Sequence, residues 1–209
     1  MLDIVRVVPA DAYFSLTWMI GTRCNYDCMY CPTELHDDSS TPASLEKLQQ
    51  YWKSIYEKTQ HQKLKYKISF TGGEVTVNKN FKNLVQWIRE NYAQDIFQIL
   101  LTTNGSASTA YYRNLYQYVD NISFSLHSEH ADEQAFFKTV CELKSTIPSN
   151  KFLHVCIMDE YWNQSRIAQY VELLEQRNIS YSVNKINYDK ANRNVVVFKG
   201  VQNFAPSEL

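Results

Sequence analysis

Three cysteines lie close together near the start of the chain, in the stretch Cys24-Asn25-Tyr26-Asp27-Cys28-Met29-Tyr30-Cys31. The chain contains 5 cysteines, so most of its thiols belong to this one stretch. Disulfide bonds do not fit the pattern, because three is an odd number and the intervals are too short for ordinary bridges. We therefore interpret the stretch as a metal-binding loop that follows a predicted strand.

Two kinds of metal site are compatible with these thiols. Zinc could be bound by Cys24, Cys28 and Cys31 together with His36, because three cysteines and one histidine form an established structural zinc set. An iron–sulfur cluster could instead be held by the three thiolates alone, which leaves one iron of a four-iron cube without a protein ligand. An open metal position is what catalysis needs and what a structural site avoids. The cysteine spacing by itself leaves both interpretations open.

The spacing of the cysteines, with an aromatic residue directly before the last one, resembles the cluster loop of the radical S-adenosylmethionine (SAM) enzymes. Further motifs follow in the order typical of that family, at the ends of predicted strands. They are Ser69-Phe70-Thr71-Gly72-Gly73-Glu74, Thr102-Thr103-Asn104-Gly105 and Ser123-Phe124-Ser125-Leu126. Four signals in the family's order favour the iron–sulfur interpretation over zinc.

Hydrophobic periodicity predicts an alternation of strands and helices along the chain. We expect strands at about 13–20, 66–71, 96–103, 121–127, 152–158 and 180–186, with a further strand at 194–199 also compatible with the pattern. We expect helices at about 44–58, 79–92, 108–118, 132–145 and 163–176. Strands that alternate with helices indicate an α/β protein with a parallel sheet.

The resemblance implies a partial (β/α)6 barrel, and the six strands expected from periodicity agree with it. We predict one radical SAM domain over 1–209, with a core at 13–190, an N-terminal arm at 1–12 and a short C-terminal extension at 191–209. In barrels of this kind ligands bind at the carboxyl ends of the strands, which is where all the motifs lie.

The predicted strands alternate apolar and polar residues instead of being apolar throughout. In the strand at 96–103 we expect Phe97, Ile99 and Leu101 to face the helices, while Thr102 faces the interior. Helices that cover all the apolar faces would leave the polar faces to line a common cavity. The pattern thus predicts a ligand-holding interior rich in hydrogen-bonding groups.

The resemblance also implies roles for individual residues. Cys24, Cys28 and Cys31 would hold a [4Fe-4S] cluster whose fourth iron is chelated by SAM. The glycine-glycine-glutamate motif would contact the methionine amine, and Tyr30 would lie near the adenine. Predicted SAM-binding residues are Tyr30, Gly72, Gly73, Glu74, Thr102, Asn104, Ser125, His127, Met158 and Asn184.

Some positions depart from the family pattern or carry separate hypotheses. Val75 replaces a common proline after the glutamate, and His127 replaces a common aspartate. Cys156 faces inward and could donate a hydrogen atom to a product radical, although a small buried apolar role competes with this one. Thr33 resembles the threonine that the carboxydeazaguanine synthases use to bind Mg²⁺.

Composition limits the classes of function. The formal net charge of −1 and the 21% of charged residues give no general attraction to nucleic acid or membranes. No apolar run is long enough for a membrane span, and the N-terminus does not resemble a signal peptide, so we expect a cytoplasmic protein.

The resemblance implies an oxidoreductase or lyase that cleaves SAM reductively to a 5′-deoxyadenosyl radical, with a donor such as flavodoxin or ferredoxin supplying the electron. A small-molecule substrate, nucleobase-like or pterin-like, is favoured because the two remaining cysteines cannot hold a second cluster. Three alternatives stay open. They are a glycyl-radical-enzyme activase acting on a protein partner, a barrel that binds SAM without radical chemistry, and a zinc-stabilised binding protein.

Overall fold

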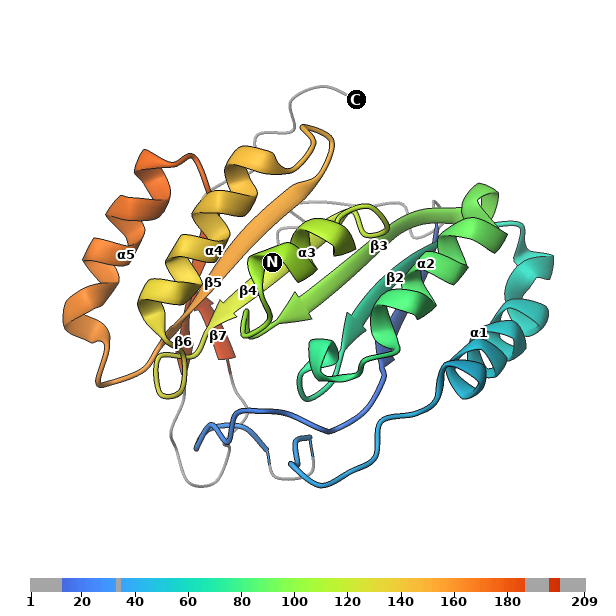
Figure 1. The fold of residues 1–209 in the computed structure, drawn as a ribbon, viewed down its shortest axis with the longest axis horizontal. Helices are drawn as coiled ribbons and strands as arrows, with labels where there is room; N and C mark the ends of the chain where they lie inside the picture. Colours follow the sequence, from blue (N-terminus) through green and yellow to red (C-terminus); the bar gives the residue numbers. More distant parts are fainter. Residues whose placement is uncertain (1–12, 33–34, 187–195, 200–209) are drawn as a thin grey trace, which may run out of the picture.

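The computed structural model describes residues 13–32, 35–186 and 196–199. These residues form one seven-stranded sheet in which the strands follow one another in chain order (Figure 1). The first six strands are parallel, and the seventh is antiparallel to the sixth. The strands are β1 (Tyr13–Met19), β2 (Lys65–Thr71), β3 (Ile96–Thr103), β4 (Asn121–Leu126), β5 (Phe152–Asp159), β6 (Ser180–Ile186) and β7 (Val196–Lys199).

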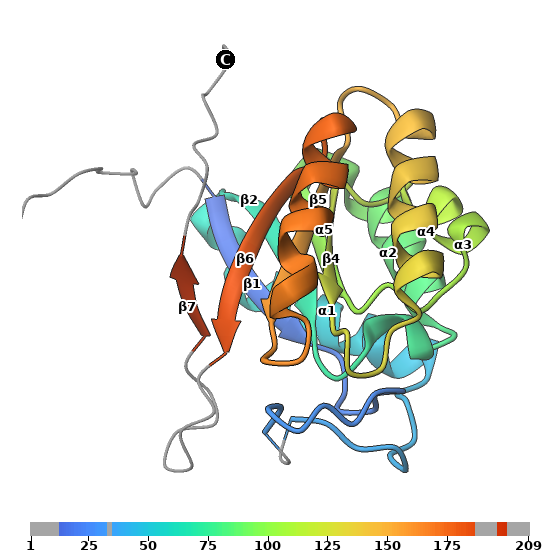
Figure 2. The ribbon, with the colours of Figure 1, turned by 90° about the vertical axis from the view of Figure 1, so that its left-hand side faces the viewer.

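The α/β class and the six parallel strands predicted from periodicity are confirmed, and the further strand is present as an antiparallel edge. A helix follows each of the first five strands, and the helices lie along one side of the curved sheet (Figures 1 and 2). The helices are α1 (Leu45–Thr59), α2 (Phe81–Tyr92), α3 (Thr109–Leu115), α4 (Glu133–Thr146) and α5 (Gln164–Gln176).

Polar side chains cap three of these helices at the start. Ser44 accepts a hydrogen bond from the amide of Lys47, Ser108 from Tyr111, and Asp132 accepts the corresponding bond at the start of α4. The predicted helix at 108–118 ends earlier, at Leu115, because the chain tightens there into shorter turns. Such turns commonly close a helix and redirect the chain toward the next strand.

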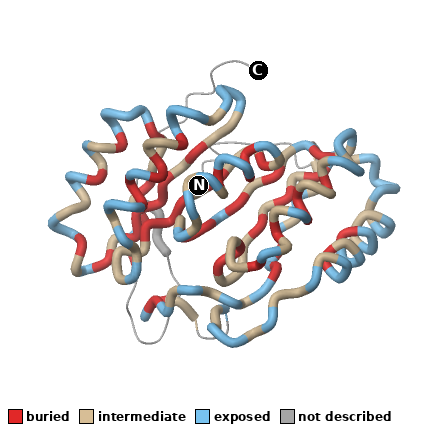
Figure 3. The backbone as a smooth tube through the Cα atoms, in the orientation of Figure 1, coloured by how far each residue is buried: buried red, intermediate tan, exposed pale blue. Residues whose placement is uncertain are grey.

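The core lies between the helices and the apolar face of the sheet, where Figure 3 shows the buried residues gathered along the strands and the inner sides of the helices. Trp52 of α1 is 0% exposed and packs edge-on against Tyr66 of β2, with ring centroids 5.2 Å apart. Truncating such a buried aromatic residue typically costs about 3–5 kcal/mol. The helices thus cover one face of the sheet, and the opposite face lines an interior cavity.

The prediction that Phe97 faces the helices is wrong. The pairing of β2 with β3 shifts register, so that Tyr66 pairs with Ile96 and Lys67 with Gln98. Phe97 is the additional residue, and such an insertion turns a side chain to the other face of a sheet. Phe97 is 53% exposed and stacks on Tyr13 at 5.2 Å between ring centroids, while Ile96 takes the buried position.

The predicted N-terminal arm at 1–12, Thr33 and most of the C-terminal extension lie outside the described residues. The single-domain boundaries therefore stay a prediction. Within the described part of the chain, no helix combines the length and the apolar character needed to cross a membrane.

Candidate functional site

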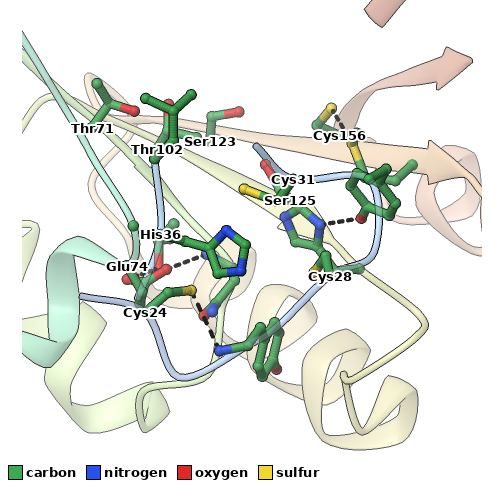
Figure 4. Close-up of a pocket in the computed structure, with 18 of the residues that line it drawn as sticks. Cys24, Cys28, Cys31, His36, Thr71, Glu74, Thr102, Ser123, Ser125 and Cys156 are labelled. Carbon is green, nitrogen blue, oxygen red and sulfur yellow. Dashed lines mark hydrogen bonds between the residues drawn. The ribbon is translucent and has the colours of Figure 1, made fainter. Parts of the chain in front are cut away.

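A cavity of about 650 Å³ opens at the carboxyl ends of the parallel strands. The segment after β1 crosses this edge of the sheet, so the cysteine loop covers the cavity (Figures 1 and 4). The structure brings together, in the lining of this cavity, all of the predicted site residues that it describes. They are Cys24, Cys28, Tyr30, Cys31, Gly72, Gly73, Glu74, Thr102, Asn104, Ser125, His127, Cys156, Met158 and Asn184.

The two glycines of the second motif hold the segment that leads into the cysteine loop. The Gly73 amide donates to the carbonyl of Gly21 at 3.0 Å. A β-carbon on Gly73 would lie 2.2 Å from the carbonyl oxygen of Thr22. A β-carbon on Gly72, whose φ is +147°, would lie 2.4 Å from the carbonyl oxygen of Gly21. Only glycine permits this approach of two backbones, which places Cys24 beside the end of β2.

Glu74 joins the ends of two strands through its buried carboxylate. Its Oε1 accepts hydrogen bonds from the amide of Thr76 at 2.8 Å and from the hydroxyl of Thr103 at 2.8 Å. Its Oε2 accepts from the amide of Asn104 at 2.6 Å. Burial raises the pKa of Glu74, and these hydrogen bonds act in the opposite direction. A carboxylate oxygen has more than one acceptor position, so Oε2 can still accept from a cationic ligand group.

The turn after Glu74 keeps its shape although valine replaces the family's proline. Val75 begins the short 3₁₀ helix η2 (Val75–Val77) and is 2% exposed. The amide of Asn78 donates to the Val75 carbonyl at 3.2 Å, which closes this turn. Burial of the valine and a backbone hydrogen bond thus hold the turn in this chain.

His36 lines the cavity beside Cys24 (Figure 4), but both of its ring nitrogens have partners. Its Nε2 lies 2.8 Å from a carboxylate oxygen of Asp27, and its Nδ1 lies 3.0 Å from the carbonyl of Pro32. The hydrogen bond with Asp27 is the main cause that raises the pKa of His36. The fourth ligand of the zinc alternative is therefore already engaged in loop contacts.

The thiols are partly or fully withdrawn from solvent. Cys28 is 6% exposed, and burial raises its pKa to about 12, while Cys24 and Cys31 are half-buried. Burial also raises the pKa of Cys24. No lysine or arginine lines the described part of the cavity, so no permanently charged cationic side chain there would balance three thiolates. A bound metal would supply that balance, and the soft thiolate donors fit an iron–sulfur cluster.

The interior below the loop carries hydrogen-bonding side chains, as the alternation of the strands predicts. Thr102, Ser123 and His154 lie in one row across β3, β4 and β5. The imidazole of His154 contacts the hydroxyl of Ser180 at 2.9 Å through Nδ1 and that of Ser182 at 3.1 Å through Nε2. Burial lowers the pKa of His154, so this row presents uncharged hydrogen-bonding groups.

Cys156 faces the cavity from β5 and is 7% exposed. Its sulfur accepts a hydrogen bond from Asn184 and lies 3.8 Å from the sulfur of Met158. Burial raises the pKa of Cys156, which keeps it as a thiol. Its role as a hydrogen-atom donor stays a prediction.

Three acidic or imidazole side chains beside the loop were not predicted from the sequence. Glu129 accepts a hydrogen bond from the amide of Met29 at 3.1 Å, and ligand atoms of Cys28, Glu129 and His130 lie within 4.8 Å of one another. Glu160 is 0% exposed and accepts from the hydroxyl of Tyr30 at 2.9 Å. Their positions shortly after β4 and β5 could have indicated a role at the site, because functional groups in this class of fold lie at the carboxyl ends of the strands.

Comparison with known proteins gives a family match over most of the chain. The family model described as the Radical SAM superfamily matches residues 18–148. A GTP 3',8-cyclase from Pasteurella multocida (strain Pm70) is 34% identical over 96 residues, which cover 44% of this chain and 26% of the relative. The chain thus matches about a quarter of the length of that curated relative.

Two solved structures share the fold. Streptococcus suis SuiB superimposes with a TM-score of 0.62 at 16% identity, covering 91% of this chain and 43% of SuiB. BtrN in complex with AdoMet and 2-DOIA gives a TM-score of 0.50 at 14% identity, covering 83% of this chain and 70% of BtrN. These likenesses agree with the partial barrel expected for the sheet.

Proposed function

Because the chain belongs to the radical SAM superfamily, whose enzymes use a [4Fe-4S] cluster and SAM, we propose that Cys24, Cys28 and Cys31 hold that cluster. When bound, the cluster would supply the electron that cleaves SAM to methionine and a 5′-deoxyadenosyl radical, which abstracts a hydrogen atom from the substrate. The observation that carries this proposal is the convergence of the three cysteines and the strand-end motifs on one cavity.

The chain's own residues would bind and orient SAM. Glu74 offers Oε2 to the methionine ammonium, while its other hydrogen bonds fix its position between β2 and β3. Asn104 presents its side chain at the same edge, next to the loop. Further side chains from the ends of β3 to β6 would contact the ribose, the carboxylate and the adenine. They are Thr102, Ser125, His127, Met158 and Asn184.

The substrate proposed for this site is a small molecule, nucleobase-like or pterin-like, bound below SAM in the interior that carries the hydrogen-bonding side chains. A cavity of about 650 Å³ falls within the range of small-ligand sites. The similarity to a GTP 3',8-cyclase supports this class, although it covers only part of either chain. Walls that exclude water would keep the radical from reacting with solvent. A flavodoxin or ferredoxin would supply the electron.

The direct test is anaerobic. The protein is reconstituted with iron and sulfide, reduced with dithionite and mixed with SAM, and 5′-deoxyadenosine is measured by chromatography. Wild type is expected to form the product and Cys28→Ala to form none. Cys141→Ala is the matched control, because Cys141 lies on α4 outside the cavity. A colourless protein that holds one zinc and forms no deoxyadenosine would overturn the proposal in favour of a zinc-stabilised binding protein.

A measurement of SAM binding and a search for a protein radical, added to this assay, separate the remaining alternatives. A barrel that binds SAM without radical chemistry would bind SAM and form no deoxyadenosine. A glycyl-radical-enzyme activase would form it and transfer the radical to a partner protein, detectable as a glycyl signal. The Mg²⁺ role of Thr33 stays a prediction, since that residue lies outside the described part of the chain.

A further inference from the structure

The second half of the cysteine loop is attached to the sheet through the side chain of Tyr30. This residue lies between Cys28 and Cys31 and is 9% exposed. Its hydroxyl donates to Oε1 of Glu160 at 2.9 Å and is also hydrogen bonded to Nδ1 of His127. The rings of Tyr30 and His127 stack with centroids 5.9 Å apart and planes inclined by 17°. The Tyr30 side chain is therefore held at its ring and at its hydroxyl.

Glu160 is itself fixed by groups behind it. Its Oε2 accepts from the indole nitrogen of Trp162 at 2.9 Å and from the hydroxyl of Ser128. The side-chain amide of Asn163 donates to Ser128 Oγ at 2.9 Å and to the carbonyl of Met158 at 2.9 Å. These hydrogen bonds join the loop after β4 to the loop after β5. Glu160 thus has both carboxylate oxygens committed within a cross-linked pair of loops.

The burial of Glu160 is costly for folding alone. Taking a carboxylate out of water is unfavourable unless its oxygens are hydrogen bonded, and a charged partner would be the usual compensation. The partners of Glu160 in the described structure are the hydroxyls of Tyr30 and Ser128 and the indole of Trp162, which are neutral. An apolar residue would fill the same space with a smaller loss of folding free energy. The carboxylate is therefore explained better by the hydrogen bond that it accepts from Tyr30.

The two halves of the cysteine loop are anchored separately. The Cys24 half is attached to the ends of β2 and β3, through the backbone of Gly73 and the side chain of Asn104. The half that contains Cys28 and Cys31 is attached to the loops after β4 and β5 through Tyr30 and the amide of Met29. The separation between the sulfurs thus depends on both anchors.

We propose that Glu160 is a positioning residue that holds the Cys28–Cys31 half of the loop in place through the hydroxyl of Tyr30, before any cluster is bound. Among the described residues, the loop group that is hydrogen bonded to Glu160 is the Tyr30 hydroxyl. Weakening Glu160 should therefore loosen this half of the loop, and removing the hydroxyl, which also bonds His127, should loosen it at least as much. Changing Glu160 in addition should then loosen it no further.

The test uses hydrogen exchange of the reduced, metal-free protein, read by mass spectrometry over peptides that cover the loop. Two loop amides are useful reporters, because Cys31 donates to the carbonyl of Cys28 at 2.9 Å and Met29 donates to Glu129 at 3.1 Å. Tyr30→Phe is expected to speed exchange of these amides about tenfold or more, the effect of losing a hydrogen bond to a charged group. Glu160→Gln is expected to speed it less, because the amide oxygen can still accept from the Tyr30 hydroxyl without the charge. The double variant should match Tyr30→Phe.

Glu133→Gln is the matched control. It removes the charge of a carboxylate that pairs with Arg166 at a distance of 3.0 Å, and neither residue of this pair belongs to the cysteine loop. It should leave exchange of the loop unchanged. Unchanged exchange in Tyr30→Phe, or effects that add in the double variant, would overturn the proposal. If Glu160→Gln does not fold, Tyr30→Phe is compared with His127→Ala, because the same hydroxyl also bonds His127. Only faster exchange in Tyr30→Phe than in His127→Ala would then support the role of Glu160. The protein is metal-free, so the result does not depend on whether the proposed cluster chemistry is correct.

Discussion

Asn104, directly after β3, donates a hydrogen bond from its side-chain amide to Oδ1 of Asn25 at 2.9 Å, next to Cys24. Its own Oδ1 accepts from the amide of Ser106 at 3.0 Å, which fixes the side chain in this direction. A residue that the family resemblance assigns to SAM thus also secures the cysteine loop. Both functions need a short amide side chain at the end of a strand.

Replacing Asn104 should therefore weaken metal retention as well as SAM binding. Asn104→Ala removes one hydrogen bond to the loop, worth about 1 kcal/mol, which corresponds to roughly a fivefold change in an equilibrium. We expect reconstituted Asn104→Ala to lose iron to a chelator about fivefold faster than wild type. Ser106→Ala keeps the amide that contacts Asn104 and serves as the control. Equal rates of iron loss in wild type and Asn104→Ala would contradict this role.

Gly73→Ala should prevent assembly of the metal site. The added β-carbon would lie 2.2 Å from the carbonyl oxygen of Thr22 and 2.4 Å from that of Arg23, so one backbone must move. We expect loss of the iron–sulfur absorbance after reconstitution and a loss of stability of about 3 kcal/mol, a magnitude typical of severe local strain. Gly21→Ala is the control, because a β-carbon there meets nothing within 4 Å. A Gly73→Ala protein with full absorbance would refute this reading of the motif.

Glu74→Gln should separate SAM binding from cluster binding. The amide keeps the volume of the carboxylate and removes the charge that attracts an ammonium group. We expect the dissociation constant for SAM to rise about tenfold or more, while iron content stays near the wild-type level. Calorimetry on the reconstituted protein measures the first quantity, and iron analysis measures the second. Unchanged SAM affinity would show that Glu74 serves only to join β2 and β3.

The imidazole of His127 should make stability fall in acid. Burial, and to a lesser extent the neighbouring His130, lowers its pKa to about 4 in the folded protein. The unfolded chain binds that proton near pH 6.5, so the stabilising contribution is present above pH 6.5 and is lost as pH falls toward 4. We expect the difference in unfolding free energy between wild type and His127→Gln to shrink by about 3 kcal/mol across this window. Denaturant titrations at several pH values measure it, and a constant difference would contradict the assignment.

The alternation of strands and helices and the position of the site could be predicted from the sequence because both depend on local patterns. In β2, β4 and β5 the alternation of apolar and polar residues can be recognised within each strand's own sequence. The motifs can be recognised by their residue types, and they lie at the strand ends. The inward faces of Thr102 and Ser125 follow from the same period, and the structure places both residues in the cavity.

The remaining features depend on contacts between distant residues. The turn of Phe97 away from the helices results from a register shift in the pairing of β2 with β3, and no pattern within β3 indicates this shift. Glu160 could not be recognised because its partner Tyr30 is 130 residues away, and one glutamate after a strand has many uses. The attachment of Asn25 to Asn104 across 79 residues is of the same kind.

The central claim is that Cys24, Cys28 and Cys31 hold a four-iron cluster with one iron open to SAM. Electron paramagnetic resonance of the reconstituted, dithionite-reduced protein, recorded with and without SAM, tests it most directly. The account predicts the signal of a reduced four-iron cluster whose g values change when SAM is added, and no such signal in Cys28→Ala. A four-iron signal that SAM leaves unchanged, or a protein that binds zinc and shows no cluster signal, would contradict it.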